Sequence, residues 1–197
     1  MRIGLVIAME EEFSKVLGDR EITKVSDAPF PVFSVKSPFG EVTAVVCGIG
    51  KINAAAGTAY LFDTRNVGEV INFGVCGATK GAFLRGETAV VGTVVERDFD
   101  LSAGLGAGWE SPRIELATGD PEAVLYTADV FTTSSENDGY FDMEGYAVAR
   151  VAKAYGKKCT LVKSVTDIID SGLQSEQFIC NYDRACELLR NELSRYI

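Results

Sequence analysis

Short apolar segments alternate with helical patterns along this chain, and this alternation limits the folds that it can adopt. RIGLVIA at residues 2–8 is almost entirely apolar, and EVTAVVCG at 41–48 is similar. Such runs are typical of strands buried on both faces, as in a parallel sheet covered by helices. KINAAAGTAYLFDTR at 51–65 instead has the apolar spacing of a helix. The alternation predicts an α/β fold, with helices on both sides of a mixed, mainly parallel central sheet.

The rest of the chain extends this pattern. PFG at 38–40 predicts a turn, and hence a hairpin between segments 31–37 and 41–48. EVINFGVCGA at 69–78 predicts a strand that runs into a glycine-containing turn. No repeat or linker interrupts residues 1–197, so we expect a single domain. Further elements are expected in this order: strands at 87–100 and 121–131, a helix at 143–156, a strand at 158–170 and a helix at 175–197.

The composition narrows the range of partners and compartments. A net charge of -9 argues against nucleic-acid and anionic-membrane partners, because both require a positive face. The five cysteines are odd in number and form no CxxC pair, which indicates free thiols in a reducing compartment. We find no leader segment and no apolar run of the roughly 20 residues that span a bilayer. These features predict a cytoplasmic protein.

The chain contains no histidine. A Ser–His–Asp or Cys–His triad within the chain is therefore excluded, and so is a histidine-ligated metal site. Acid–base chemistry would fall to carboxylates, lysine, tyrosine or cysteine. We expect neither a metal nor a cofactor.

Polar and glycine-rich groups follow the predicted strands at the ends where α/β sheets bind ligands. This convergence predicts a site for a small molecule. GIGK at 48–51 is not a phosphate-binding loop, because Val45 stands where a Walker A loop needs glycine and Asn53 breaks the Rossmann pattern. The groups that converge are Glu10 to Glu12, the GIGKINAAAG turn at 48–57, the GVCGA stretch at 74–78, Asp129, Phe131, Met143, Glu144, Thr166 and Asp167.

Six of these segments resemble, in order, motifs of the nucleoside phosphorylase and nucleosidase superfamily. The resemblance is strongest to its 5'-methylthioadenosine/S-adenosylhomocysteine nucleosidases and covers nearly the whole chain. It implies a nucleoside phosphorylase-like fold and hydrolysis of the N-glycosidic bond of a purine nucleoside. The segments are IGLVIAMEEEF, GIGKINAAAGTAYL, INFGVCGA, DVF, MEGYAVA and VKSVTD.

The resemblance also implies the roles of two carboxyl groups. Asp167 would protonate N7 of the departing purine, and Glu12 would activate the attacking water. To donate a proton at neutral pH, Asp167 needs a pKa above its usual value of about 3.9, which burial can supply. Glu10 and Glu11 would then be ordinary acidic residues of a first helical turn, while Glu12 turns inward.

Further roles implied by the resemblance concern the sugar and the base. Glu144 would accept hydrogen bonds from the ribose hydroxyls, and Met143 would lie under the sugar. Phe131 would stack on the purine, and the backbone of Thr132 would bind the edge of the base.

Each of these residues also has a structural interpretation. Asp167 suits a helix N-cap, Glu144 suits a first-turn acid, and Phe131 and Met143 suit a hydrophobic core. Three more polar residues receive no functional role. Lys51 and Arg97 are interpreted as surface residues, and Asp142 as a structural acid.

The chain departs from the family pattern at three places near the predicted site. Val75 replaces the serine usual in these nucleosidases, and Thr166 replaces a serine while keeping the hydroxyl. Only 11 residues, 132–142, separate Phe131 from Met143, where the family has a longer stretch with a helix. The base and the 5'-substituent are therefore open.

Two other functions stay open. A phosphate-dependent phosphorylase is the alternative within the superfamily, although an anionic Glu12 would repel phosphate. A catalytically inactive nucleoside-binding protein is the alternative from another class. We expect a homodimer by analogy, with the excursion at 98–112, which carries Phe99, Leu105 and Trp109, as the contact.

Overall fold

The computed structural model describes residues 2–38, 40–108 and 110–197, so Trp109 lies outside the described residues. Its centre is a parallel group of four strands in the order β4 (Val42–Val46), β1 (Ile3–Ile7), β5 (Glu69–Ala78) and β10 (Lys158–Ile168). Alternate residues of β1 enter different cores, one containing Leu5 and the other Val6. The first strand is therefore buried on both faces, as its apolar run predicts.

Antiparallel strands extend the sheet beyond β4. β3 (Val32–Val35) pairs with β4 and completes the predicted hairpin, and β2 (Ile22–Ser26) pairs with β3 at the edge. The sequence pattern did not predict β2. Its three central residues, Thr23, Lys24 and Val25, are all exposed, so no alternation of apolar and polar residues marks it.

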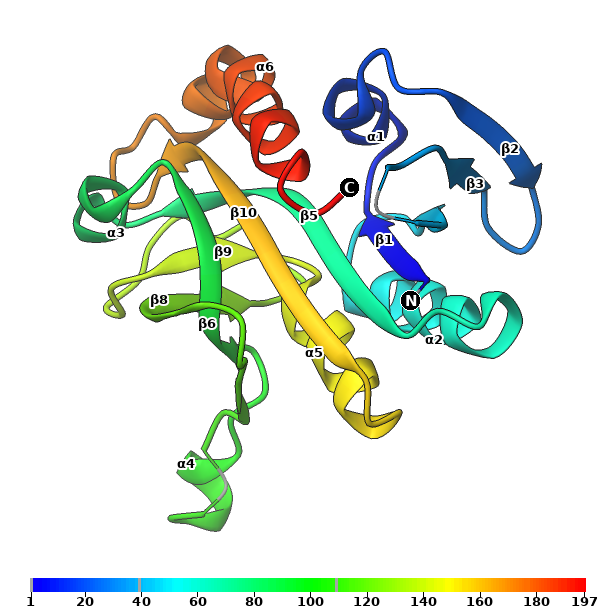
Figure 1. Cartoon of the computed structure of the whole chain (residues 1–197). Helices are drawn as coiled ribbons and strands as arrows, with labels where there is room; N and C mark the ends of the chain where they lie inside the picture. The colour runs from blue at the N-terminus through cyan, green and yellow to red at the C-terminus, as the bar shows by residue number, and fades with distance from the viewer. Residues whose placement is uncertain (1, 39, 109) are drawn as a thin grey trace.

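On the other side of the parallel group, five strands close into a ring. β10 pairs with β6 (Thr88–Glu96), β6 with β8 (Asp120–Thr127), β8 with the short β9 (Tyr140–Asp142), and β9 with β5. β7 (Arg113–Glu115) adds to β6. Figure 1 shows this curled part of the sheet beside the flatter part that contains β1. The closure brings β9 against the end of β5, where the candidate site lies.

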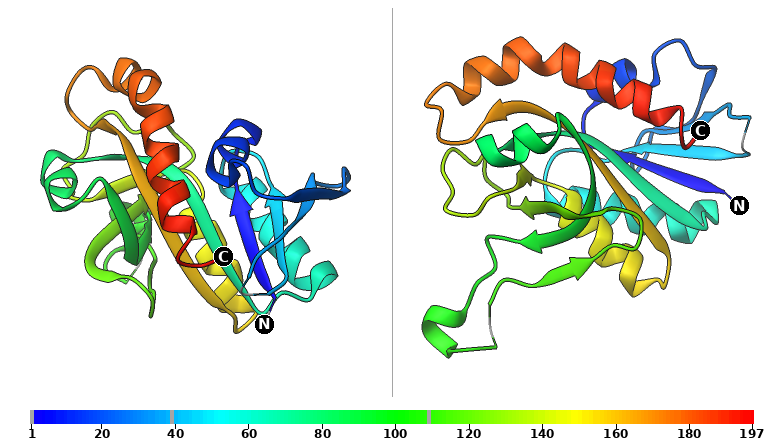
Figure 2. Two further views of the ribbon diagram at one scale, coloured as in Figure 1. Left: turned by 45° about the horizontal axis from the view of Figure 1, so that its top comes forward. Right: turned by 60° about the vertical axis from the view of Figure 1, so that its left-hand side comes forward.

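Helices cover both faces of the central strands. α1 (Glu10–Leu17) and α6 (Gln174–Leu193) pack on one face, and α2 (Lys51–Arg65) and α5 (Gly145–Ala154) pack on the other. Figure 2 shows the sheet between these layers. The predicted α/β fold with its mixed sheet is thus confirmed. No helix within the described residues is long and apolar enough to cross a membrane.

Three segments between β5 and β7 differ from the sequence prediction. β5 continues through the glycines to Ala78 instead of turning, because it pairs with β10 along that length. The excursion after β6 contains the short helix α4 (Ser102–Leu105), which projects from the body in Figures 1 and 2. A further short helix, α3 (Lys80–Arg85), follows β5 and was not predicted.

Candidate active site

A cavity of about 240 Å³ lies where the carboxyl ends of β1, β5 and β10 meet the start of α5. A smaller cavity of about 40 Å³ adjoins it and shares part of its lining, including Phe131, Met143 and Asp167. Of the residues singled out from the sequence, Thr132 lines the smaller cavity and not the main one. The main cavity brings together the other seven: Glu12, Val75, Phe131, Met143, Glu144, Thr166 and Asp167.

Glu12 is the member of the acidic triplet that faces the cavity. α1 starts at Glu10, directly after β1, and successive helical residues point about 100° apart, so only one of the three can face the sheet. Glu10 and Glu11 are exposed, whereas Glu12 is 1% exposed. Its Oε1 accepts a hydrogen bond of 2.8 Å from the Val75 N–H. Burial raises the pKa of Glu12, and the charge of Lys163 and the backbone donors oppose that rise.

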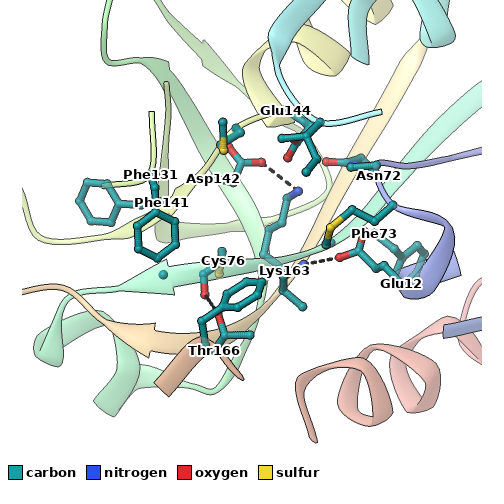
Figure 3. A pocket seen from close by; sticks show the side chains of 18 of the residues that line it. Glu12, Asn72, Phe73, Cys76, Phe131, Phe141, Asp142, Glu144, Lys163 and Thr166 are labelled. Carbon is teal, nitrogen blue, oxygen red and sulfur yellow. Dashed lines mark hydrogen bonds and ion pairs between the residues drawn. The ribbon is translucent and has the colours of Figure 1, made fainter. Parts of the chain in front are cut away.

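Lys163 is the main site residue that sequence reasoning missed. It lies in the middle of β10, is 1% exposed, and its Nζ is 2.9 Å from Asp142 Oδ2. Figure 3 shows the side chain directed toward Asp142 and Glu144. Burial alone would lower the pKa of Lys163, but the surrounding carboxylates, first Asp142 and then Glu144, raise it above its ordinary value. The signal in the sequence was a lysine inside the apolar run of a buried strand, where lysine is rare unless paired.

Asp142 anchors this lysine from β9. Its Oδ1 accepts a hydrogen bond of 2.6 Å from the Thr127 hydroxyl, and its Oδ2 accepts one of 2.8 Å from the Gly145 N–H. Asp142 therefore connects β8, the start of α5 and Lys163. The sequence interpretation of Asp142 as a structural acid agrees with these contacts, although its side chain also lines the cavity.

Glu144 stands at the N-cap of α5 and is largely buried. Its Oε1 accepts a hydrogen bond of 2.8 Å from the N–H of Gly50, which has a φ of 97° that only glycine adopts readily. Burial, reinforced by the charge of Asp142, raises the pKa of Glu144 to about 7. The GIGK turn therefore orients a carboxylate and does not form a phosphate loop.

Asp167 is the last residue but one of β10. The register of β10 against β5 shifts between Val165 and Asp167. Its Oδ1 accepts a hydrogen bond of 2.7 Å from the Thr166 hydroxyl, while its Oδ2 is buried with no partner among the described residues. Burial raises the pKa of Asp167 against the effect of the Thr166 hydrogen bond. The free Oδ2 faces Gly77, where an added Cβ would lie 3.0 Å from it.

Asn72 supplies a second buried oxygen of this kind. Its Nδ2 donates a hydrogen bond of 2.9 Å to the Val6 carbonyl, and its Oδ1 has no partner among the described residues. Buried polar atoms are normally paired. Two unpaired oxygens in the wall of one cavity, on Asn72 and Asp167, therefore mark positions that a polar ligand would satisfy.

Aromatic and aliphatic side chains form the rest of the wall. Phe131 is 48% exposed at the rim, and its ring lies edge-on to Phe178 of α6 with centroids 6.3 Å apart. Val75 lines the cavity, but its backbone N–H, and not its side chain, holds Glu12. The cavity thus offers an apolar surface for a flat or aliphatic ligand next to a cluster of ionisable groups.

Comparison with known proteins identifies the family of this chain. A model of the phosphorylase superfamily matches residues 2–136. The chain belongs to this superfamily. Among curated members, it is 26% identical over 215 residues to the 5'-methylthioadenosine/S-adenosylhomocysteine nucleosidase of Bacillus cytotoxicus, covering 91% of this chain and 92% of the relative. It is 35% identical over 104 residues to the enzyme of the same name from Maridesulfovibrio salexigens, covering 52% and 45%.

Solved structures of the superfamily have the same fold. The futalosine hydrolase of Helicobacter pylori superposes with a TM-score of 0.85 at 21% identity, covering 98% of this chain and 95% of that one. The 5'-methylthioadenosine/S-adenosylhomocysteine nucleosidase of the same organism, in complex with an inhibitor, also gives 0.85 at 21% identity, covering 99% and 97%.

The charges in the cavity can serve proton transfer. Lys163 is the only cation among the described residues that line it, and it is already paired with Asp142. Burial raises the pKa of both Glu12 and Asp167, but the charge of Lys163 opposes the rise only at Glu12, so Glu12 is the better candidate for a base and Asp167 for an acid. Among the described residues, no group of His, Cys, Asp or Glu is arranged to hold a metal ion.

Proposed function

We propose that this protein hydrolyses the N-glycosidic bond of a purine nucleoside of the 5'-methylthioadenosine/S-adenosylhomocysteine type. The observation that carries the proposal is the pair of carboxyl groups in one cavity, Glu12 beside Lys163 and Asp167 with an unpaired oxygen. The names of the curated relatives agree with this reaction.

In the proposed reaction the purine leaves as a neutral base. Asp167 donates its proton to N7 while the bond between C1' and N9 breaks, and the bonding electrons pass to the base. Glu12 accepts a proton from water as the water oxygen bonds to C1'. The two carboxyl groups then exchange protons with solvent and return to their starting states. General acid catalysis by Asp167 would contribute roughly 10²–10⁴-fold.

The other cavity residues would bind the nucleoside. Glu144 would accept hydrogen bonds from the ribose hydroxyls, with Met143 against the sugar and Thr166 orienting Asp167. Phe131 would stack on the purine, and the Thr132 backbone would bind its edge. Stacking of this kind adds about 0.5–1.5 kcal/mol to the burial of the ring.

Hydrolysis is favoured over phosphorolysis by the charge of the site. Lys163, the one cation among the described residues that line the cavity, is paired with Asp142, and the neighbouring groups Glu12 and Glu144 are acidic, so a phosphate ion there would meet an excess of negative charge. A carboxylate at the position of Glu12 attracts the proton of a water molecule and repels an anion.

We also propose that the protein is a homodimer of the cytoplasm. The N-terminal end of α2 and the segment around α4 carry exposed apolar side chains, including Ile52, Phe99 and Leu105. Ile49, next to them, lines the cavity, so a second copy on this face would close its entrance. The five cysteines are free, as expected in a reducing compartment.

The test is chromatographic release of free base. The purified protein is incubated with methylthioadenosine, S-adenosylhomocysteine, adenosine, inosine or futalosine, each with and without phosphate. Release that does not depend on phosphate supports the proposal, and the preferred nucleoside identifies the base and the 5'-substituent. Release only with phosphate would make the protein a phosphorylase, and saturable binding without release would make it a nucleoside-binding protein.

A further inference from the structure

The segment that borders the smaller cavity is irregular, although it holds the predicted base-binding residue. Between β8 and β9, residues 128–139 form no helix or strand. Within the described residues, the N–H and carbonyl of Thr132 have no hydrogen-bond partner. An irregular backbone with free polar groups needs support from other parts of the chain to keep one conformation.

Arg97 supports this segment from one side. It follows β6, and its guanidinium donates to the Thr132 hydroxyl oxygen at 3.0 Å and to the Ser134 carbonyl at 3.2 Å. The guanidinium also lies 5.8 Å from the ring centroid of Phe141, which lines both cavities. Arg97 is half-buried, so its interpretation as a surface residue is corrected here. Its planar, forked group is suited to holding two acceptors at once.

Gln174 supports the segment from the other side. It begins α6, is largely buried, and its Nε2 donates a hydrogen bond of 2.6 Å to the Thr133 carbonyl. The same carbonyl accepts a hydrogen bond of 3.1 Å from the Asp170 N–H, and Asp170 Oδ2 accepts one of 3.3 Å from the Ser135 N–H. The Thr133 carbonyl is therefore fully occupied. The backbone groups of Val130, Phe131 and Thr132, which line the smaller cavity, have no hydrogen-bond partner within the described residues, and of these three residues Thr132 is the one whose side chain is held by Arg97.

These contacts hold Thr132 and the two residues that follow it. Arg97 holds the side chain of Thr132, and Gln174 holds the carbonyl of the next residue. The two supports come from β6 and α6, which are far apart in the sequence. Together they fix the side chain of Thr132 and the peptide group after Thr133, and so limit the backbone rotations that set the direction of the Thr132 N–H and carbonyl.

We propose that Arg97 and Gln174 are positioning residues that hold the Thr132 backbone for binding the edge of the purine. This inference rests on the proposed function. Neither side chain touches the reacting atoms, so losing either should weaken binding of the base more than it slows bond cleavage. The N–H and carbonyl of one residue form a donor and acceptor pair, which matches the donor and acceptor pair on the edge of adenine or hypoxanthine.

The test compares Arg97→Ala, Arg97→Lys, Thr132→Val and Gln174→Ala with the wild type. Thr132→Val removes only the hydroxyl that Arg97 holds and nearly preserves the shape of the side chain. Arg184→Ala is the matched control, because Arg184 forms a bidentate ion pair with Glu87 and does not line the cavity. The measurements are KM and kcat for base release, the dissociation constant of free adenine and hypoxanthine, and Tm.

We expect Arg97→Ala and Gln174→Ala to raise KM and the dissociation constant of the free base about tenfold, the usual effect of losing one strong hydrogen bond. The value of kcat should stay within about threefold, since the acid and base are untouched. Arg97→Lys should recover little, because a single ammonium does not reproduce the fork. Arg184→Ala should change only Tm.

Two results would overturn the inference. One is a set of variants that lower Tm as Arg184→Ala does while leaving KM and base binding unchanged, which would make both residues purely structural. The other is a wild type that binds neither base. If the wild type binds base but releases none from any nucleoside, the proposed function fails, and the comparison of base affinity still tests the positioning role.

Discussion

At the scale of single residues, the site depends on a buried lysine among carboxylates. Lys163 lies with Asp142, Glu12 and Glu144 in a part of the molecule that solvent barely reaches. A buried charge is tolerated only where a partner and hydrogen bonds compensate for lost hydration. Asp142 supplies the partner, and Thr127 holds Asp142 in turn.

We predict that Lys163→Met destabilises the protein by about 3–5 kcal/mol, because it leaves Asp142 buried without its partner. The double variant Lys163→Met/Asp142→Asn should lose less, since it removes both charges. Urea denaturation monitored by circular dichroism measures both, together with the single variant Asp142→Asn. A double variant that loses the sum of the two single effects would show that the ion pair is not the source of the loss.

The same lysine bears on the pH dependence of activity. Its charge lowers the pKa of Glu12 against the larger opposite effect of burial. In Lys163→Met the pKa of Glu12 should rise further, so the acidic limb of the kcat/KM profile should move to higher pH. If the acidic limb does not move in a folded variant, the charge of Lys163 does not influence the ionisation of Glu12 that controls activity.

We predict that Asp167→Asn lowers kcat by roughly 10²–10⁴-fold, because an amide has no proton to give to the purine. The wild-type rate should also fall as pH rises through the folded-state pKa of Asp167, which burial raises. The stability from this raised pKa is fully present below about pH 3.9 and is lost as pH rises through the folded value. In Asp167→Asn the free energy of unfolding should therefore decline less as pH rises. Full activity in this variant would show that Asp167 is not the proton donor.

At the scale of elements, β5 positions Asp167 because its glycines have no side chains that would occupy the space beside β10. Its glycines continue the strand beside β10 and leave space for the side chains that β10 directs into the cavity. At Gly77 an added Cβ would lie 2.9 Å from Ile169 Cδ1 and 3.0 Å from Asp167 Oδ2. The glycines of this stretch are therefore explained by close approach and not by a turn.

We predict that Gly77→Ala lowers kcat by about 10²-fold through displacement of Asp167, a cost typical of misplacing a catalytic group by about 1 Å. Asp19→Ala is the control, because Asp19 is exposed and lines neither cavity. Steady-state kinetics with a saturating nucleoside measures the effect. Equal rates in both variants would mean that the space beside Asp167 is dispensable.

At the scale of the whole molecule, one face carries both the cavity entrance and an exposed apolar surface. The proposed homodimer would bury Ile52, which is 82% exposed, together with the α4 segment. Ile52→Asp would carry a charge into the contact. Leu84→Asp would leave the contact unchanged, because Leu84 is exposed on α3, which lies at the opposite side of the molecule from α2 in Figure 1.

We predict that the wild type has twice the mass of one chain in light scattering and that Ile52→Asp has the mass of one chain. Leu84→Asp should keep the mass of the wild type. A monomeric wild type would rule out the homodimer. An Ile52→Asp variant that remains a dimer would place the contact elsewhere.

Much of this protein was predictable because its signals are local. Apolar runs and helical spacing determined the strands and helices that frame the cavity, and the order of polar groups after strand ends indicated where a ligand would bind. Glu144, Asp167 and the acidic triplet Glu10 to Glu12 were found in this way, and the resemblance to the nucleosidases singled out Glu12. β2, β9 and the short helices were missed, because exposed or three-residue elements leave no period to detect.

What the sequence by itself determined, then, is the α/β fold, the edge that carries the site and the carboxyl groups there, because covalent order and hydrophobic period specify them. Only the tertiary structure decided what surrounds those groups. The Lys163–Asp142 pair joins β10 to β9, and the Arg97 and Gln174 contacts join β6 and α6 to one loop. Such contacts depend on strand register and closure of the ring, and no local pattern records which distant side chains those bring together.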